Sequence, residues 1–117
     1  MTSVSIQEWQ VLSCLEVEPE LLDPAEPWVV NDAVYRVTQG DLTLSFSIAP
    51  SYRDVRIILR RGEEHLYELN ASDVSDVVYR RESDLEQIEV ILTDRDRICL
   101  RIKPQICLEQ SVLGRSI

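Results

Sequence analysis

Histidine is almost absent from this sequence, and its scarcity argues against most acid–base catalysis. The single histidine, His65, follows Glu63 and Glu64, and no nucleophile motif accompanies it. A hydrolytic triad needs a nucleophile, a base and an orienting group together in space. His65 is therefore interpreted as a surface residue at a turn, and we predict a protein that is not an enzyme.

Glycine is scarce as well, which excludes the loops that bind phosphate groups. Gly40, Gly62 and Gly114 lie far apart, whereas a phosphate-binding loop needs clustered glycines around the anion. Asp94 and Asp96 form one D-x-D pair, without the further oxygen ligands and the glycine of a calcium loop. The sequence therefore predicts neither a cofactor nor a metal site.

The few cysteines and the lack of long apolar runs indicate the compartment. Cys14, Cys99 and Cys107 cannot all pair within one chain, and no two have the spacing of metal ligands. Reduced thiols are typical of the cytoplasm, so we predict a cytoplasmic protein. No apolar run approaches the roughly 18 residues of a membrane span, and the N-terminus lacks the pattern of a secretory signal.

Basic residues are missing from the first third of the chain, where acids are frequent. The net charge is −9, and residues 1–34 hold seven acids and no base. These acids are Glu8, Glu16, Glu18, Glu20, Asp23, Glu26 and Asp32. Such a field disfavours nucleic acid and anionic membranes and favours a basic protein partner. Plain solubility is the alternative explanation for this charge.

Residues 1–27 predict a helix followed by an acidic loop with three prolines. Ser5 and Glu8 have the spacing of a capping box, in which each side chain accepts a backbone N–H of the other residue. A helix from Ile6 would carry Ile6, Trp9 and Leu12 or Ser13 along one stripe. The same segment also fits a strand with apolar residues at every second position, so residues 6–15 stay open between the two, with the helix preferred because of the cap.

The clearest strand signal lies in residues 33–48. Apolar and hydroxyl residues alternate there with a period of two, and Gly40-Asp41 suits a two-residue type II′ turn. That turn pairs Val37 with Leu44, Tyr35 with Phe46, and Ala33 with Ile48. A slip of one residue would break every apolar pair.

Two further hairpins are predicted downstream. In residues 55–69, two loop lengths are possible. A two-residue loop pairs Leu59 with Leu66, whereas a three-residue loop pairs Leu59 with Tyr67 and Ile57 with Leu69. The three-residue loop is preferred because it separates Ile57 from Glu68. In residues 87–103, a loop at 94–96 pairs Leu92 with Ile98, Val90 with Leu100, Ile88 with Ile102, and Glu89 with Arg101. Between these hairpins, residues 74–80 fit either a helical turn or a strand.

Together these patterns predict a mainly β fold in one domain, residues 1–117. Residues 28–109 would form an antiparallel meander of roughly six to eight strands, and residues 110–117 a frayed tail. A meander of this kind must cover its apolar face. The sequence leaves open whether the sheet rolls up, closes into a barrel, forms a sandwich or takes the N-terminal helix as a cover.

The acidic N-terminal third is the predicted partner-binding region. Its candidate residues are Glu16, Glu18, Glu20, Asp23, Glu26 and Trp28. Aromatic residues beside acids can anchor a basic protein, although a core position is preferred for Trp9 and Trp28 because large aromatic side chains are mostly buried. In composition the chain is similar to protein inhibitors such as bacterial immunity proteins, and this resemblance implies a non-enzymatic inhibitor or adaptor that presents acidic surface to a basic partner.

Two alternatives use other parts of the sheet. One is a small-ligand-binding or accessory domain with a pocket in the rolled sheet, marked by convergent polar groups. The other concerns assembly. An exposed edge at residues 106–108 would allow a homodimer by strand pairing.

Overall fold

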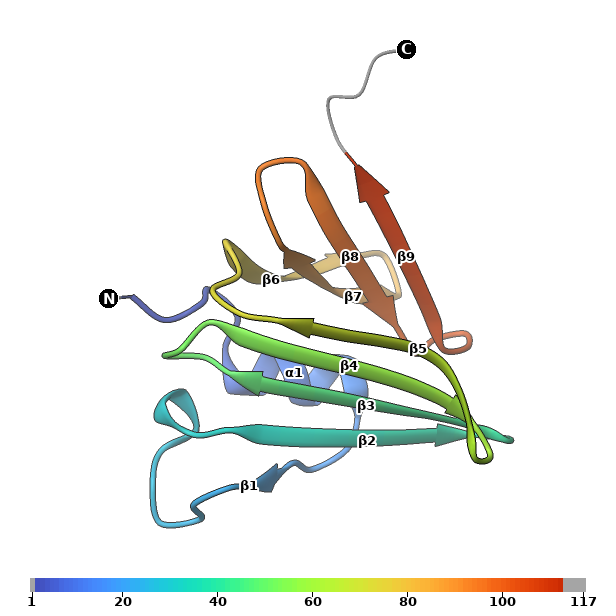
Figure 1. Ribbon diagram of the computed structural model, residues 1–117, viewed down its shortest axis with the longest axis horizontal. Coiled ribbons are helices and arrows are strands. Elements are labelled where there is room, and N and C mark those ends of the chain that lie inside the picture. The colour runs from blue at the N-terminus through green and yellow to red at the C-terminus, as the bar shows by residue number, and fades with distance from the viewer. Residues whose placement is uncertain (1, 113–117) are drawn as a thin grey trace.

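Two antiparallel sheets and one short helix make up the computed structural model, which describes residues 2–112 (Figure 1). The helix is α1 (Glu8–Leu15), and a 3₁₀ turn, η1, covers Trp28–Val30. The first sheet contains β1 (Glu20–Leu21), β2 (Ala33–Gln39), β3 (Leu42–Ala49), β4 (Asp54–Arg61) and β5 (Glu64–Ala71). The second contains β6 (Asp76–Glu82), β7 (Leu85–Ile91), β8 (Asp96–Arg101) and β9 (Cys107–Val112).

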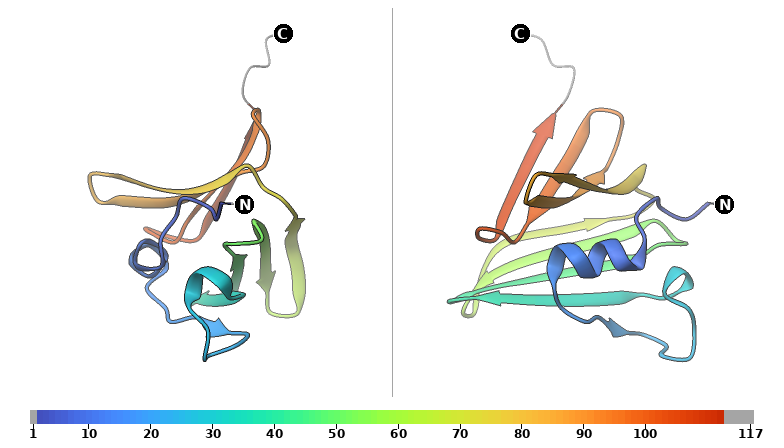
Figure 2. Two further views of the ribbon diagram at one scale, coloured as in Figure 1. Left: turned by 90° about the vertical axis from the view of Figure 1, so that its left-hand side faces the viewer. Right: turned by 180° about the vertical axis from the view of Figure 1, so that it is seen from behind.

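Strand order follows chain order in both sheets, so the predicted mainly β antiparallel meander is confirmed. The described residues contain nine strands, more than the six to eight expected, and one of them is the two-residue β1. The chain changes sheets between β5 and β6. Figure 2 (left) shows the two sheets meeting at an angle, with α1 on the inner side of the second sheet.

The core fills the angle between the two sheets and the helix. The fully buried side chains include Tyr35, Leu44, Phe46 and Ile57 from the first sheet, Ile88, Val90, Ile98 and Leu100 from the second, and Val11 and Leu15 from α1. Because side chains alternate across each strand, one face of each sheet is apolar and the other is polar. The helix covers part of the apolar surface that the two sheets leave open.

The hairpin of β2 and β3 has the predicted register. Val37 pairs with Leu44, Tyr35 with Phe46, and Ala33 with Ile48. Gly40 has φ of 60°, the positive value that the first central position of a type II′ turn requires.

The hairpin of β4 and β5 combines the two registers considered. Ile57 pairs with Leu69 and Leu59 with Tyr67, as preferred, but the loop has two residues because Arg61 pairs with Glu64. A register shift between Leu59 and Arg60 reconciles the preferred pairs with the two-residue loop. It leaves Leu66 as the extra residue of a β-bulge.

The predicted register of β7 and β8 is wrong by two residues. Ile88 pairs with Leu100 and Val90 with Ile98, so Glu89 lies opposite Cys99 instead of Arg101. The turn is closed by Thr93, whose Oγ1 accepts hydrogen bonds from the N–H groups of Arg95 and Asp96. A shift of two keeps every side chain on its own face, so the apolar pattern does not distinguish the two registers.

The helix is confirmed for residues 8–15, but its predicted cap and stripe are wrong. The N-cap is Gln7, which forms a capping box with Gln10. Ser5 instead binds the carboxylate of Asp76 through its N–H and its hydroxyl. The buried face consists of Val11, Cys14 and Leu15. Ile6 lies before the helix, and its N–H donates to Val77 O.

The remaining segments are more extended than expected. Residues 76–82 form β6, which decides between the helical turn and the strand. The short continuation expected at residues 106–108 is the six-residue β9, which ends at Val112. The predicted tail at 110–117 is therefore wrong for residues 110–112, and residues 113–117 lie outside the described part of the chain.

Candidate protein-binding surface

Residues 16–32 lead from α1 to β2, and we call them the acidic segment. They run past the edge of the first sheet, where β1 pairs with β2 (Figure 1). The structure exposes all five predicted carboxylate residues along this segment: Glu16, Glu18, Glu20, Asp23 and Glu26. Asp32, at its end, is exposed as well. The acidic segment is therefore a band of negative charge on the surface.

Two of these carboxylates contact basic side chains. Glu16 pairs with Lys103, and the hydrogen bond to Glu16 raises the pKa of Lys103. Glu20 pairs with Arg36 at 2.7 Å, with both side chains more than half exposed. Within residues 2–112, Glu18, Asp23 and Glu26 form no ion pair. Exposed pairs contribute little in water, so the band keeps most of its charge available to a partner.

Asn31 fixes the shape of the acidic segment. Its side chain is buried, and its Oδ1 accepts hydrogen bonds from the N–H groups of Asp23 and Asp32 at 3.1 Å each. Its Nδ2 donates to the carbonyl oxygens of Asp23, at 2.6 Å, and Glu26, at 3.0 Å. A buried side chain with four such bonds closes the loop around itself. Sequence reasoning missed this residue, because an asparagine in a polar loop is ordinarily a turn residue.

Trp28 departs from its predicted role as a partner contact. It is only 8% exposed, and its Nε1 donates a hydrogen bond to Tyr35 Oη at 2.8 Å. Burial is the largest of the effects that together raise the pKa of Tyr35 to about 12; the hydrogen bond from Trp28 acts to lower it, and Glu8 and Glu18 act to raise it. Trp28 therefore supports the acidic segment from the core. Trp9 is the exposed tryptophan, with its ring 6.0 Å from that of Tyr79.

Exposed apolar side chains lie where the acidic segment approaches the start of β2. They are Leu22, Val29, Val30 and Tyr52, of which Leu22 is 80% exposed. Ser51 donates two hydrogen bonds to Val29 O, from its N–H at 3.1 Å and its hydroxyl at 2.6 Å, which joins the β3–β4 loop to η1. Sequence reasoning missed these residues, although apolar residues in polar loops are a usable signal of an interface.

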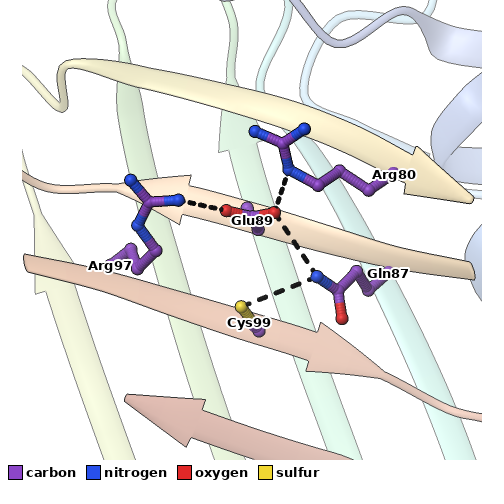
Figure 3. A network of polar contacts seen from close by, with 5 residues as sticks. All are labelled: Arg80, Gln87, Glu89, Arg97 and Cys99. Carbon is purple, nitrogen blue, oxygen red and sulfur yellow. Dashed lines mark hydrogen bonds and ion pairs between the residues drawn. The ribbon is translucent and has the colours of Figure 1, made fainter. Parts of the chain in front are cut away.

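A second polar cluster lies on the outer face of the second sheet (Figure 3). Glu89 is 3% exposed and binds Arg80 and, at 2.8 Å, Arg97. Gln87 lies between the Glu89 carboxylate and the thiol of Cys99. Both guanidinium groups share the one buried carboxylate, and the network ties β6, β7 and β8 together. We assign it a structural role, because the Glu89 side chain is buried and both of its charged partners come from neighbouring strands of the same sheet.

The other candidate groups do not assemble into a reactive site. His65 is half-exposed and pairs with Glu68 at 3.5 Å. Cys99 lies opposite Glu109, and Cys107 opposite Arg101, so the two thiols are not cross-strand partners. Residues 2–112 contain no group of three His, Cys, Asp or Glu side chains that could hold a metal ion. In the same part of the chain, no helix has the length and apolar character needed to cross a membrane.

Two surface hollows on the sheets could accept a small ligand. One hollow of about 230 Å³ lies on the polar face of the first sheet, with Ser47, Arg56 and Asn70 in its lining. Another of about 260 Å³ lies between β5 and β9, next to Tyr67 and Leu108. Ligand pockets usually enclose about 300–1,000 Å³, and the angle between the sheets is filled by the core. These two hollows therefore give little support to a small-ligand pocket within the sheets, whereas a larger groove of about 460 Å³ lies outside them, between residues 3–8 and residues 27–29.

Comparison with known proteins gives a structural match. No protein-family model matches the sequence, and no curated protein sequence matches it either. A solved chain from the "Contact-dependent growth inhibition toxin - immunity protein complex from Klebsiella pneumoniae 342" superposes with a TM-score of 0.78 and 22% sequence identity. The match covers 95% of this chain and 98% of that chain. The two chains therefore share their fold over almost their whole lengths.

Proposed function

We propose that this protein is a non-enzymatic binding protein of the immunity type, which neutralises a basic toxin by covering it. The observation that carries the proposal is the acidic segment, closed by the hydrogen bonds of Asn31 and flanked by exposed apolar side chains, on a fold shared with a chain of a toxin–immunity complex. Acidic surface steers a basic partner toward the complex, and apolar contacts slow its dissociation. The proposed partner is a protein, not nucleic acid, a membrane or a cofactor.

The charge favours the immunity role over the toxin role. A net charge of −9 suits the inhibitor of a basic protein, and the described residues offer no assembled set of catalytic groups. The proposed location is the cytoplasm, where the free thiols of Cys14, Cys99 and Cys107 would remain reduced.

The contact surface that we propose comprises the acidic segment and its apolar neighbours. Its charged members are Glu16, Glu18, Glu20, Asp23 and Glu26. Its apolar members are Leu22, Val29, Val30 and Tyr52. Exposed apolar side chains contribute most to affinity when water is excluded around them, so Val29 and Tyr52, held close together through Ser51, are the proposed anchors.

A capture experiment with matched charge reversals tests this function. The purified protein is used to capture proteins from the lysate of its source organism, and the bound fraction is washed at low and high salt and identified by mass spectrometry. We expect a basic protein that is lost at high salt. Co-expression with the captured protein should then restore growth to cells that it inhibits.

The decisive comparison is between two triple variants of equal charge. Reversal of Glu18, Asp23 and Glu26 to lysine should reduce capture and growth protection at least tenfold. Reversal of Glu63, Asp84 and Asp94, exposed acids in three turns between strands, changes the net charge equally and should reduce both much less. Equal losses in the two variants would show that only net charge matters, and protection by neither protein would reject the immunity role.

A further inference from the structure

A groove of about 460 Å³ runs between the N-terminal segment and η1, beside the acidic segment. Residues 3–8 form one wall, and Pro27, Trp28 and Val29 form the other. Buried side chains of Val4, Ile6 and Trp28 belong to this lining. The groove therefore has apolar surface at its base, although it opens on a strongly acidic part of the molecule.

Both walls are held by hydrogen bonds in the unbound protein. On the N-terminal side, the N–H of Val4 donates to Pro50 O at 3.2 Å and that of Ile6 to Val77 O at 2.8 Å. On the other side, Val29 O accepts both bonds from Ser51. A preformed groove loses little conformational entropy when it is occupied.

Two carboxylate residues border the groove, and one base lies at its N-terminal end. Glu8 is exposed and is part of the lining, and Glu26 directly precedes Pro27. The base nearest to the N-terminal wall is Arg53, whose guanidinium already donates to the carbonyl oxygens of Thr2, Ser3, Val74 and Ser75. Glu8 forms no ion pair within residues 2–112, so a cationic side chain entering the groove would meet a carboxylate without a bound counter-charge.

We propose that this groove receives an arginine side chain from a loop of the basic partner. The aliphatic part of the arginine packs against Trp28 and Val29, and its guanidinium binds the carboxylate of Glu8. Arginine suits such a site better than lysine, because its planar group pairs with a carboxylate through two parallel hydrogen bonds and stacks on apolar surface. The inference rests on the proposed function for the identity of the partner, but the groove can be tested without it.

The test uses a single amino acid as the probe. Nα-acetyl-L-arginine N-methylamide is titrated into ¹⁵N-labelled protein, and amide and indole chemical shifts are followed by NMR. We expect saturable shifts at Glu8, at Val29 and at the indole N–H of Trp28, with a Kd on the order of 10 mM for so small a ligand. The corresponding citrulline derivative, which has the same shape and no charge, should bind several-fold more weakly.

Glu8→Gln removes the charge, and Glu63→Gln is its matched control at the β4–β5 turn. Glu8→Gln should weaken arginine binding about threefold, as expected for one exposed ion pair, and Glu63→Gln should leave it unchanged. Shifts that do not saturate, or that weaken equally in both variants, would overturn the proposal.

The two proposals fail separately. If the protein captures its basic partner but the groove does not bind arginine, the immunity function stands and the groove is wrong. If arginine binds in the groove but no basic toxin is neutralised, the groove stands and the proposed function is wrong.

Discussion

Replacing Glu89 with glutamine should destabilise this fold strongly, even though the residue lies on the outer face of a sheet. Its side chain is 4% exposed and is shared by Arg80, which is 58% exposed, and Arg97, which is 25% exposed. Loss of one partner from a fully buried ion pair costs about 3–5 kcal/mol. Arg80 can turn to water, whereas Arg97 stays mostly buried, so we expect a smaller loss of about 2 kcal/mol.

The structure adds a specific reason why Arg97 is sensitive. Its Nε is buried and has no hydrogen-bond partner among the described residues, so its contact with Glu89 is the ion pair through Nη1. A neutral amide at position 89 would leave this guanidinium in a poorly solvated place without a counter-charge. For a domain of this size, a loss of about 2 kcal/mol lowers Tm by roughly 8 °C.

Urea unfolding measures this effect, with the fluorescence of the buried Trp28 as the signal. Glu109→Gln is the matched control, since it removes an ion pair to Arg101 on the same face, at 3.4 Å, from a side chain that is 69% exposed. The control should lose no more than about 0.5 kcal/mol. Arg97→Met in the Glu89→Gln background should restore part of the stability, because the unpaired charge is gone. Equal losses for the variants at positions 89 and 109, or no coupling between 89 and 97, would refute this reasoning.

Three further predictions concern pH, thiol reactivity and a turn. Burial acts to raise the pKa of Asp76, but hydrogen bonds from Ser5 and Val77 and the charge of Arg53 lower it overall. Because the pKa is lowered on folding, the ionised Asp76 stabilises the folded protein above the ordinary pKa of 3.8. This stabilisation is lost as the pH falls through the pKa of the folded state. Ser5→Ala should therefore flatten the stability–pH curve below about pH 4, as measured by thermal unfolding, and an unchanged slope would contradict this. Burial, reinforced by the charges of Glu86 and Glu16, raises the pKa of Cys14 to about 12. At pH 8 iodoacetamide should therefore modify the half-exposed Cys107 and spare Cys14. Mass spectrometry of the intact and digested protein would check this result. Gly40→Ala should destabilise the protein by about 1 kcal/mol in urea unfolding because φ is 60° there, and a neutral result would show that the turn adopts another conformation.

The β2–β3 and β7–β8 hairpins show what the sequence can and cannot determine about register. Between Val37 and Leu44, a two-residue loop with a glycine leaves one arrangement that suits both the turn and the apolar pairs. Between Val90 and Ile98, loops of three and five residues place the same side chains on the same faces. Hydrogen bonds within the turn, from Thr93, decide between them, and the apolar pattern contains no information about those bonds.

The burial of Glu89 could not be predicted from the sequence for a related reason. Alternation along β7 assigns it correctly to the outer face, which in an antiparallel sheet usually meets water. Its burial comes from long side chains of the neighbouring strands β6 and β8, which lie over it (Figure 3). Such cover depends on the cross-strand register, and the predicted register placed Arg101 opposite Glu89 instead of Cys99.

The charge of the acidic segment could be predicted because charge is a property of composition. The shape in which the segment presents this charge to a partner comes from the fold. A flexible acidic loop would lose conformational entropy on binding and would bind less tightly for the same contacts. Here Asn31 holds the loop from within, Trp28 anchors it to Tyr35, and Ser51 joins it to the β3–β4 loop. Asn31→Ala therefore separates charge from shape. It leaves every carboxylate in place, so the salt-dependent association rate should change little, whereas the dissociation rate should rise because the band is no longer preorganised.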